Sequence, residues 1–262
     1  MGKGVIMAVK VDYVLSLVEK GKRADGRAFD EFRKAEVEAS PIEKAEGSAR
    51  VKLGKTDVIV GIKLGVGTPF PDRLDEGTIM VNAELSPIAT TDFESGPPNE
   101  ESIELARVVD RGIRESKSID LKKLVIVPEE KVWSVFIDIH ILNHDGNLID
   151  AAGLATITAL WNAKLPELDK ENNIILETKT KHSLPMANKP IPVTVHKVGG
   201  KLMVDPDKDE ENSATSRLTI TTIENGNVCA MQKGMDALTV EEIVNAFDLS
   251  KKAGAELRKL IK

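Results

Sequence analysis

The chain has 262 residues, of which 41% are hydrophobic and 30% charged, a balance typical of a globular protein with a sizeable core. Its formal net charge of −6 argues against a nucleic-acid binder with a broad basic face, so any such contact must be local. The single cysteine, Cys229, excludes an internal disulfide, and no apolar run approaches the length of a membrane span, so we expect a cytoplasmic protein without membrane contact.

The N-terminal part of the chain is predicted to contain one helix and several strands. Hydrophobic residues at helical spacing indicate a helix from Val11 to Lys20, which Gly21 ends. After a charged turn, alternating hydrophobic residues predict two strands joined at residues 54–56 and a third strand within residues 77–88. These strands are expected to belong to one sheet.

A helix predicted from about Glu101 to Ser118 has two different faces. One face is apolar, whereas the opposite face carries three arginines at i, i+4 and i+7 spacing. The apolar face comprises Leu105, Val109, Gly112 and Ser116, flanked by Val108 and Ile113, and the cationic face comprises Arg107, Arg111 and Arg114.

The arginine face has two interpretations. It is either a solvent-exposed surface with Glu104–Arg107 and Asp110–Arg114 ion pairs, each worth about 0.2–0.5 kcal/mol, or a surface that binds an anion. Arg107 and Arg111 form a like-charge i, i+4 pair, which is unfavourable unless an anion lies across both. A phosphodiester backbone is such an anion.

Further strands are predicted at residues 124–128 and 131–142, and the second of them leads through a turn at Asp145-Gly146 into a helix over residues 151–164. A helix that follows a tight glycine turn presents unpaired backbone N–H groups, which is the geometry of a phosphate site. No cation follows the turn, and Asp150 is expected to cap the helix. The local pattern therefore favours a structural helix.

The C-terminal part repeats the order of strands followed by a helix. Strands are predicted at residues 191–198, 200–205, 216–223 and 227–232, with a hairpin turn at residues 224–227. A last helix starts at Thr239, which forms a capping box with Glu242, and is expected to bury Ile243, Val244 and Phe247. Two β-then-α halves predict a layered α/β protein.

The sequence predicts no metal site. Asp205, Asp207 and Asp209 have the spacing of the first three ligands of a calcium loop, but Glu210 stands where the loop requires glycine and Ser216 where it requires glutamate. The same acidic run leaves open a metal-dependent hydrolase as one alternative function. The remaining candidates are interpreted as structural, namely His140 and His144, expected on one face of a strand, and Cys229.

Several stretches resemble the ribonuclease PH family: RADGR at residues 23–27, GSARVKLGKTDVIVGIK at residues 47–63, and the strand, turn and helix of residues 141–163. More narrowly, residues 93–116, 132–166 and 202–212 resemble the non-catalytic ring subunits of archaeal exosomes. The resemblance covers nearly the whole chain. It implies a ribonuclease PH-like α/β fold with mixed sheets and packed helices, as a single domain over residues 1–262 whose two similar halves span 23–166 and 189–260.

Active members of this family shorten RNA from its 3′ end by phosphorolysis, and the resemblance implies that this chain has lost their anion cradle. The cradle follows the Asp-Gly turn as a Gly-Thr-Arg triplet, and the matching residues here are Asn147, Leu148 and Ile149. The arginine pair that precedes the arginine-rich helix in active members is matched by Glu100 and Glu101. A bidentate phosphate clamp is thus replaced by an aliphatic side chain and two carboxylates.

The acidic part of the family's active site is also incomplete. Of the two family acids, one is matched by Glu211, but the second falls at Arg217, which neither coordinates magnesium nor donates a proton at neutral pH. No catalytic residue and no cofactor is therefore predicted. A phosphate-dependent 3′-to-5′ exoribonuclease with a rearranged cradle remains the alternative.

The resemblance implies a supporting role in RNA degradation. Such a subunit alternates with a catalytic ribonuclease PH-like homologue in a hexameric ring, a trimer of heterodimers that also carries RNA-binding cap subunits. In the family, arginines at the positions of Arg107 and Arg111 line the RNA path, and Arg114 extends this stripe. These three arginines are the predicted RNA-binding residues.

Overall fold

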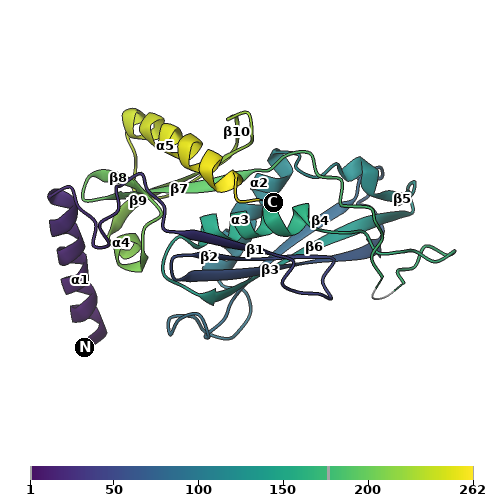
Figure 1. Cartoon of the computed structure of the whole chain (residues 1–262), viewed down its shortest axis with the longest axis horizontal. Coiled ribbons are helices and arrows are strands. Elements are labelled where there is room, and N and C mark those ends of the chain that lie inside the picture. Colours follow the sequence, from purple (N-terminus) through teal and green to yellow (C-terminus); the bar gives the residue numbers. More distant parts are fainter. Residues whose placement is uncertain (1, 176–177, 262) are drawn as a thin grey trace.

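The computed structural model describes residues 2–175 and 178–261, and it consists of two β-sheets with helices between and beside them (Figure 1). In chain order the elements are α1 (Gly2–Glu19), β1 (Ala35–Ala39), β2 (Gly47–Leu53), β3 (Thr56–Gly67), β4 (Thr78–Leu85), α2 (Glu100–Glu115), a short 3-10 helix (Leu121–Leu124), β5 (Val125–Val127), β6 (Lys131–Asn143), α3 (Leu148–Trp161), β7 (Ile191–Val198), β8 (Lys201–Val204), α4 (Lys208–Asn212), β9 (Ala214–Thr222), β10 (Val228–Met235) and α5 (Val240–Arg258).

The first sheet is mixed, in the order β1-β2-β3-β6-β4, with β5 paired to β6. The predicted hairpin β2–β3 is present, and Gly54 at its turn has a φ of 59°, a conformation that glycine adopts without strain. β3 runs antiparallel to β6, whereas the edge strand β4 is parallel to β6. The parallel pair requires a crossover connection, and α2 lies within it.

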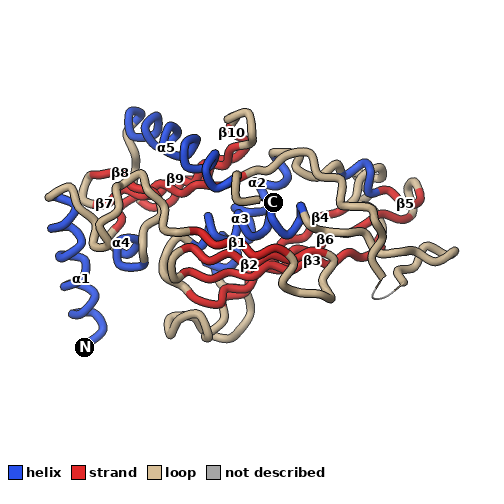
Figure 2. Tube along the Cα trace, in the orientation of Figure 1, coloured by secondary structure: helices blue, strands red, loops and turns tan. Residues whose placement is uncertain are grey.

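The second sheet is antiparallel, in the order β10-β9-β7-β8, and has a helix on each face (Figure 2). Neighbouring residues of β7 point to opposite faces. Thr194 contacts Asp150 of α3, whereas Val193 lies next to Gly254 of α5. The layers are therefore the first sheet, α3 with α2, the second sheet, and α5.

Helix α3 is the centre of the molecule, because all its residues from Leu148 to Leu160 are buried. A helix that is apolar on all sides needs neighbours on all sides, and α3 packs against β2, β3, β7 and α2. Its small residues permit this close packing: a Cβ on Gly153 would lie only 2.2 Å from Cγ of Pro192. The N-terminal turn of α3 is consequently held between the two sheets.

Two predicted helix starts were wrong. The first helix begins at Gly2 and not at Val11, and the helix after the Asp-Gly turn begins at Leu148 and not at Ala151. The short strand β1 and the single-turn helix α4 were not predicted, because each has only five residues and a charged sequence. Among the described residues, no helix combines the length and apolar character needed to cross a membrane.

Helix α5 has the predicted capping box between Thr239 and Glu242, but the prediction of its buried face was wrong for two of the three residues. Ile243 and Val244 are 37% and 54% exposed, and Phe247 is only partly buried. Hydrophobicity alone assigned the large side chains to the core, whereas close packing on the second sheet requires mostly small ones. The buried residues are Ala246, Ser250, Ala253, Gly254 and Leu257.

Candidate functional site

Helix α2 displays the arginine face that the sequence predicted. The side chain of Asn99 caps the helix by accepting a hydrogen bond from the backbone N–H of Ser102 at 2.9 Å, immediately after Pro97-Pro98. All six residues of the predicted apolar face are buried. The opposite face therefore points away from the core.

Arg107 and Arg111 are both exposed on this face. Arg107 makes no hydrogen bond or ion pair with any described residue, because Glu104, its predicted partner, binds Arg217 from β9 instead. Nη1 of Arg111 donates to Oε1 of Gln232 on β10 at 3.2 Å. Neither guanidinium has a carboxylate partner among the residues that the structure describes, so both charges remain available to an anion.

Arg114 lies on the same face but is held within the protein. Its Nε donates to both carboxylate oxygens of Asp110 at 2.8 Å, as predicted for this pair. Its Nη2 donates to the backbone oxygen of Ile79 on β4 at 2.6 Å. Arg114 thus joins α2 to the edge strand of the first sheet.

A pocket of about 230 Å³ lies beside the N-terminal end of α2, between the two halves of the chain. It brings together Glu101 and the positions to which the resemblance assigns the cradle and the two acids, whereas Glu100 lies outside its lining. The pocket is lined by Glu101, Glu104, Leu105, His144, Asn147, Leu148, Ile149, Thr194, His196, Lys208, Glu211, Asn212, Arg217 and Met235.

A carboxylate occupies the position of the anion at the N-terminus of α3, but it is not the one that the sequence indicated. Asn147 is the N-cap residue, with a φ of 57° and no side-chain capping hydrogen bond, and its backbone N–H donates to Oε1 of Glu211 at 3.3 Å. Asp150 does not cap the helix. It lies in the first turn of α3 and accepts hydrogen bonds from the backbone N–H and hydroxyl of Thr194 at 3.0 and 2.8 Å.

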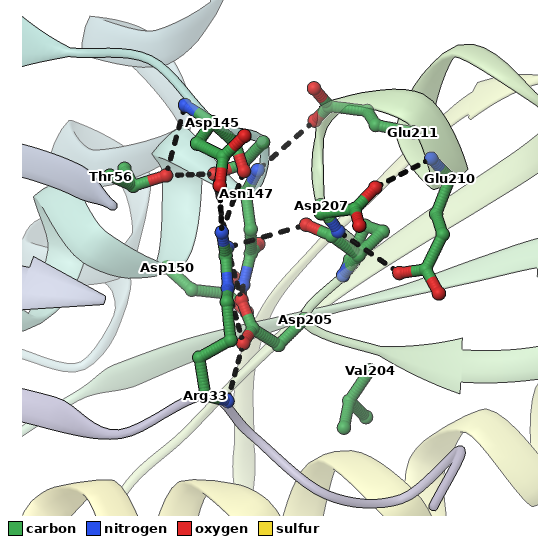
Figure 3. Close-up of polar contacts among 12 residues, drawn as sticks. Arg33, Thr56, Asp145, Asn147, Asp150, Val204, Asp205, Asp207, Glu210 and Glu211 are labelled. Carbon is green, nitrogen blue, oxygen red and sulfur yellow. Dashed lines mark hydrogen bonds and ion pairs between the residues drawn. The ribbon is translucent and has the colours of Figure 1, made fainter. Parts of the chain in front are cut away.

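Asn147, which lines the pocket, belongs to a network of ion pairs and hydrogen bonds that holds the start of α3 (Figure 3). Nδ2 of Asn147 donates to both Asp150 and Asp205, at 3.0 and 2.9 Å. Asp205 also accepts from Nε and Nη2 of Arg33 at 2.9 and 2.7 Å, and Nη1 of Arg33 donates to the backbone oxygen of Asp145. The network fixes the turn before α3 without leaving a cation for a ligand.

Charged residues of the RADGR stretch and of the acidic run have partners within the protein. Arg23 forms a buried ion pair with Glu210. Asp207 caps α4, and Asp209 pairs with Lys10, so the calcium-like spacing has no counterpart in space. No group of three or more His, Cys, Asp or Glu side chains among the described residues is arranged to hold a metal ion.

The charges in the pocket do not favour phosphate. Burial lowers the pKa of His144 to about 4 and that of His196 to about 3, so both are neutral at pH 7. Lys208 and Arg217 are the cations of the lining, against the three carboxylates of Glu101, Glu104 and Glu211. Burial raises the pKa of Glu211, against the opposing effects of the Lys208 charge and of the hydrogen bond from the backbone N–H of Asn147.

The remaining candidates are structural. His140 is exposed and pairs with Glu84, whereas His144 follows the end of β6 and stacks on Phe93, so the two histidines do not share an environment as the sequence suggested. Cys229 is partly buried, and burial raises the pKa of its thiol to about 11. It is therefore a thiol and not a nucleophilic thiolate at neutral pH.

The site includes residues that the sequence did not single out. Three of them come from the second half of the chain. They are Gln232, which contacts Arg111, and Lys208 and His196, which line the pocket. No motif marks them, because their role depends on the packing of β7, α4 and β10 beside α2 and α3.

The fold and the pocket define a protein of the ribonuclease PH type. Family models of the 3′ exoribonuclease family match residues 31–166 as domain 1 and residues 188–253 as domain 2, and the chain belongs to this family. This assignment confirms the predicted ribonuclease PH-like α/β fold.

Similar proteins span the chain from end to end. It is 49% identical over 260 residues to the exosome complex component Rrp42 of Thermococcus onnurineus, covering 98% of this chain and 96% of that protein. Identity to the Rrp42 component of Methanosarcina acetivorans is 52% over 259 residues, covering 98% and 94%.

Solved structures give the same result. A chain from the Archaeoglobus fulgidus exosome with RNA bound to the active site superposes with a TM-score of 0.92 at 50% identity, covering 98% of this chain and 100% of that one. A chain from an archaeal exosome core has a TM-score of 0.88 at 47% identity, covering 99% and 98%. Rice Rrp46, at 17% identity and a TM-score of 0.69, shares the fold.

Proposed function

We propose that this chain is a non-catalytic ring subunit of an archaeal exosome, which binds RNA in the central channel and supports a neighbouring phosphorolytic subunit during 3′-to-5′ degradation. The similarity to Rrp42 components over 98% of the chain supports membership of the exosome. The observation that carries the supporting role is the combination of the altered pocket with two arginines on α2, Arg107 and Arg111, that have no carboxylate partner among the described residues.

The chemistry of the pocket supports the absence of catalysis. Phosphorolysis requires that inorganic phosphate bind beside the terminal phosphodiester, and the cradle positions here carry Leu148 and Ile149, with Glu211 bound to the α3 N-terminus. Removing one preorganised charge costs about 10²–10³ in rate, and several are replaced in this pocket. This chemistry disfavours both the phosphorolytic alternative and a metal-dependent hydrolase.

The arginines of α2 support the proposed RNA binding. Arg107 and Arg111 lie one helical turn apart, and no carboxylate of the part of the chain that the structure describes neutralises them, so a phosphodiester backbone crossing both would relieve their mutual repulsion. Arg114 extends the stripe, but its hydrogen bonds to Asp110 and Ile79 leave its guanidinium less free to contact RNA directly. A chain with net charge −6 then guides RNA along one helix face without attracting it over the whole surface.

The proposed assembly is a hexamer in which three copies of this chain alternate with three copies of a catalytic ribonuclease PH-like homologue, with RNA-binding cap subunits on the ring, in the cytoplasm. Within it the chain would have two tasks. It completes the ring, and it holds RNA next to the homologue's active site.

The arginine assignment is tested with Arg107→Glu combined with Arg111→Glu in the ring assembled with the catalytic homologue. We expect weaker RNA binding and slower RNA shortening, with an unchanged hexamer by size-exclusion chromatography. Lys122→Glu with Lys123→Glu, two exposed lysines outside α2, makes the same change in charge and is the matched control. Wild-type RNA affinity in the arginine variant would remove these residues from the RNA path.

A further inference from the structure

The edge strand β10 lies beside the arginine face of α2. β10 is the outermost strand of the second sheet, and Gln232 pairs in register with Thr219 of β9. Together with Val108 and Arg111 of α2, these residues line a shallow depression where helix and strand meet. The side chain of Gln232 is thus fixed by the sheet at the position where it reaches Arg111.

The contact between Gln232 and Arg111 differs from those of the neighbouring arginines. Arg114 binds the carboxylate of Asp110, and Arg217 binds that of Glu104, so both charges are neutralised. Arg111 donates instead to the neutral amide oxygen of Gln232, its one hydrogen-bond partner among the described residues. An amide orients a guanidinium but leaves its full charge for a third group.

Orientation matters at this position because arginine is long and its side chain loses conformational entropy when it binds. Arg107, one turn away, has no such support from the described residues. An Arg111 that is already held beside β10 loses less freedom when it contacts a phosphate. Gln232 thus orients Arg111 without neutralising its charge, whereas a carboxylate at the same place would neutralise it.

We propose that Gln232 is a positioning residue for RNA binding, which holds the Arg111 guanidinium against β10 in the orientation that contacts the RNA backbone while leaving its charge unpaired. The inference rests on the proposed RNA-binding role of α2 and extends the binding surface from the helix to the edge of the second sheet. The predicted ligand is a single-stranded phosphodiester backbone.

The test uses the ring assembled with the catalytic homologue, a 5′-labelled oligoadenylate, and no inorganic phosphate, so that the RNA is not consumed. Gln232→Glu keeps the shape of the side chain but pairs Arg111 with a carboxylate. We expect the slope of log K against log salt to fall by about 0.7, the value of one phosphate contact on a single strand, which corresponds to about fivefold weaker binding at 0.1 M salt. Lys201→Gln, an exposed residue of β8 on the opposite edge of the same sheet, makes the same change in charge and should leave both quantities unchanged.

A second pair of variants separates positioning from a structural role. Gln232→Ala should weaken RNA binding in the wild-type background and have no further effect in an Arg111→Ala background, because Gln232 acts through Arg111. Additive effects, or a Gln232→Glu ring with wild-type affinity and salt slope, would overturn the assignment. If the ring with Arg107→Glu and Arg111→Glu loses RNA binding while the Gln232 variants keep it, only the proposed role of Gln232 is wrong. If the double arginine variant binds RNA normally, the proposed RNA-binding function of α2 is wrong.

Discussion

At the turn between β6 and α3, single side chains decide what the pocket can bind. The sequence correctly indicated that no cation follows the Asp-Gly turn, because that depends on residues adjacent in the chain. It assigned the capping carboxylate to Asp150, whereas the structure has Glu211 there. Glu211 is 64 residues away, so a local pattern gives no signal for this contact.

Asp150 provides a prediction at the same scale. It is fully buried, and burial raises the pKa of its carboxyl from 3.8 to about 7, against the opposing hydrogen bonds from Thr194 and Asn147. A raised pKa in the folded state means that its contribution to stability is complete below about pH 3.8 and is lost as the pH rises through about 7. We expect Asp150→Asn to remove this dependence.

The measurement is the free energy of unfolding of the wild type and of Asp150→Asn in denaturant between pH 4.5 and pH 8. Because other groups titrate equally in both proteins, the difference isolates Asp150. The wild type should lose about 3 kcal/mol relative to the variant across this range, at about 1.4 kcal/mol per pKa unit. A constant difference between the two proteins would show that Asp150 titrates normally.

Among the elements, helices and strands with strong hydrophobic periodicity were predicted well. The buried face of a helix was predicted correctly only where large side chains point inward. The apolar face of α2 was correct, because Leu105, Val109 and Ile113 are core residues. On α5 the prediction was wrong for Ile243 and Val244, because contact with the second sheet is made mostly by small residues such as Ala246 and Gly254. Hydrophobic size does not distinguish a close-packed face from an exposed one.

The arginines of α2 differ in what they contribute to stability. Arg114→Ala removes the hydrogen bond to the backbone oxygen of the buried residue Ile79 on β4 and leaves Asp110 without its partner, and we expect a loss of about 1–3 kcal/mol. Arg107→Ala, on the same helix face with no partner among the described residues, should change stability by less than about 0.5 kcal/mol. Equal losses by chemical denaturation would contradict the distinction between a binding arginine and a structural one.

At the scale of the molecule, the predicted alternation of strands and helices was correct, but the layering was not accessible from periodicity. The position of α3 between two sheets depends on contacts such as Gly153 with Pro192. One hydrophobic core contains residues from Ala49 to Ile261, and we propose on this basis that residues 23–166 and 189–260 are halves of a single domain. This arrangement brings Glu211 and Arg217 of the second half to the cradle positions of the first.

We propose that this chain supports RNA phosphorolysis without performing it. The most direct test is a time course on 5′-labelled RNA in magnesium and inorganic phosphate, with this chain alone, with the catalytic homologue alone, and with both. We expect this chain alone to leave the RNA intact and the mixture to release nucleoside diphosphates faster than the homologue alone. Release of nucleoside diphosphates by this chain alone would contradict it.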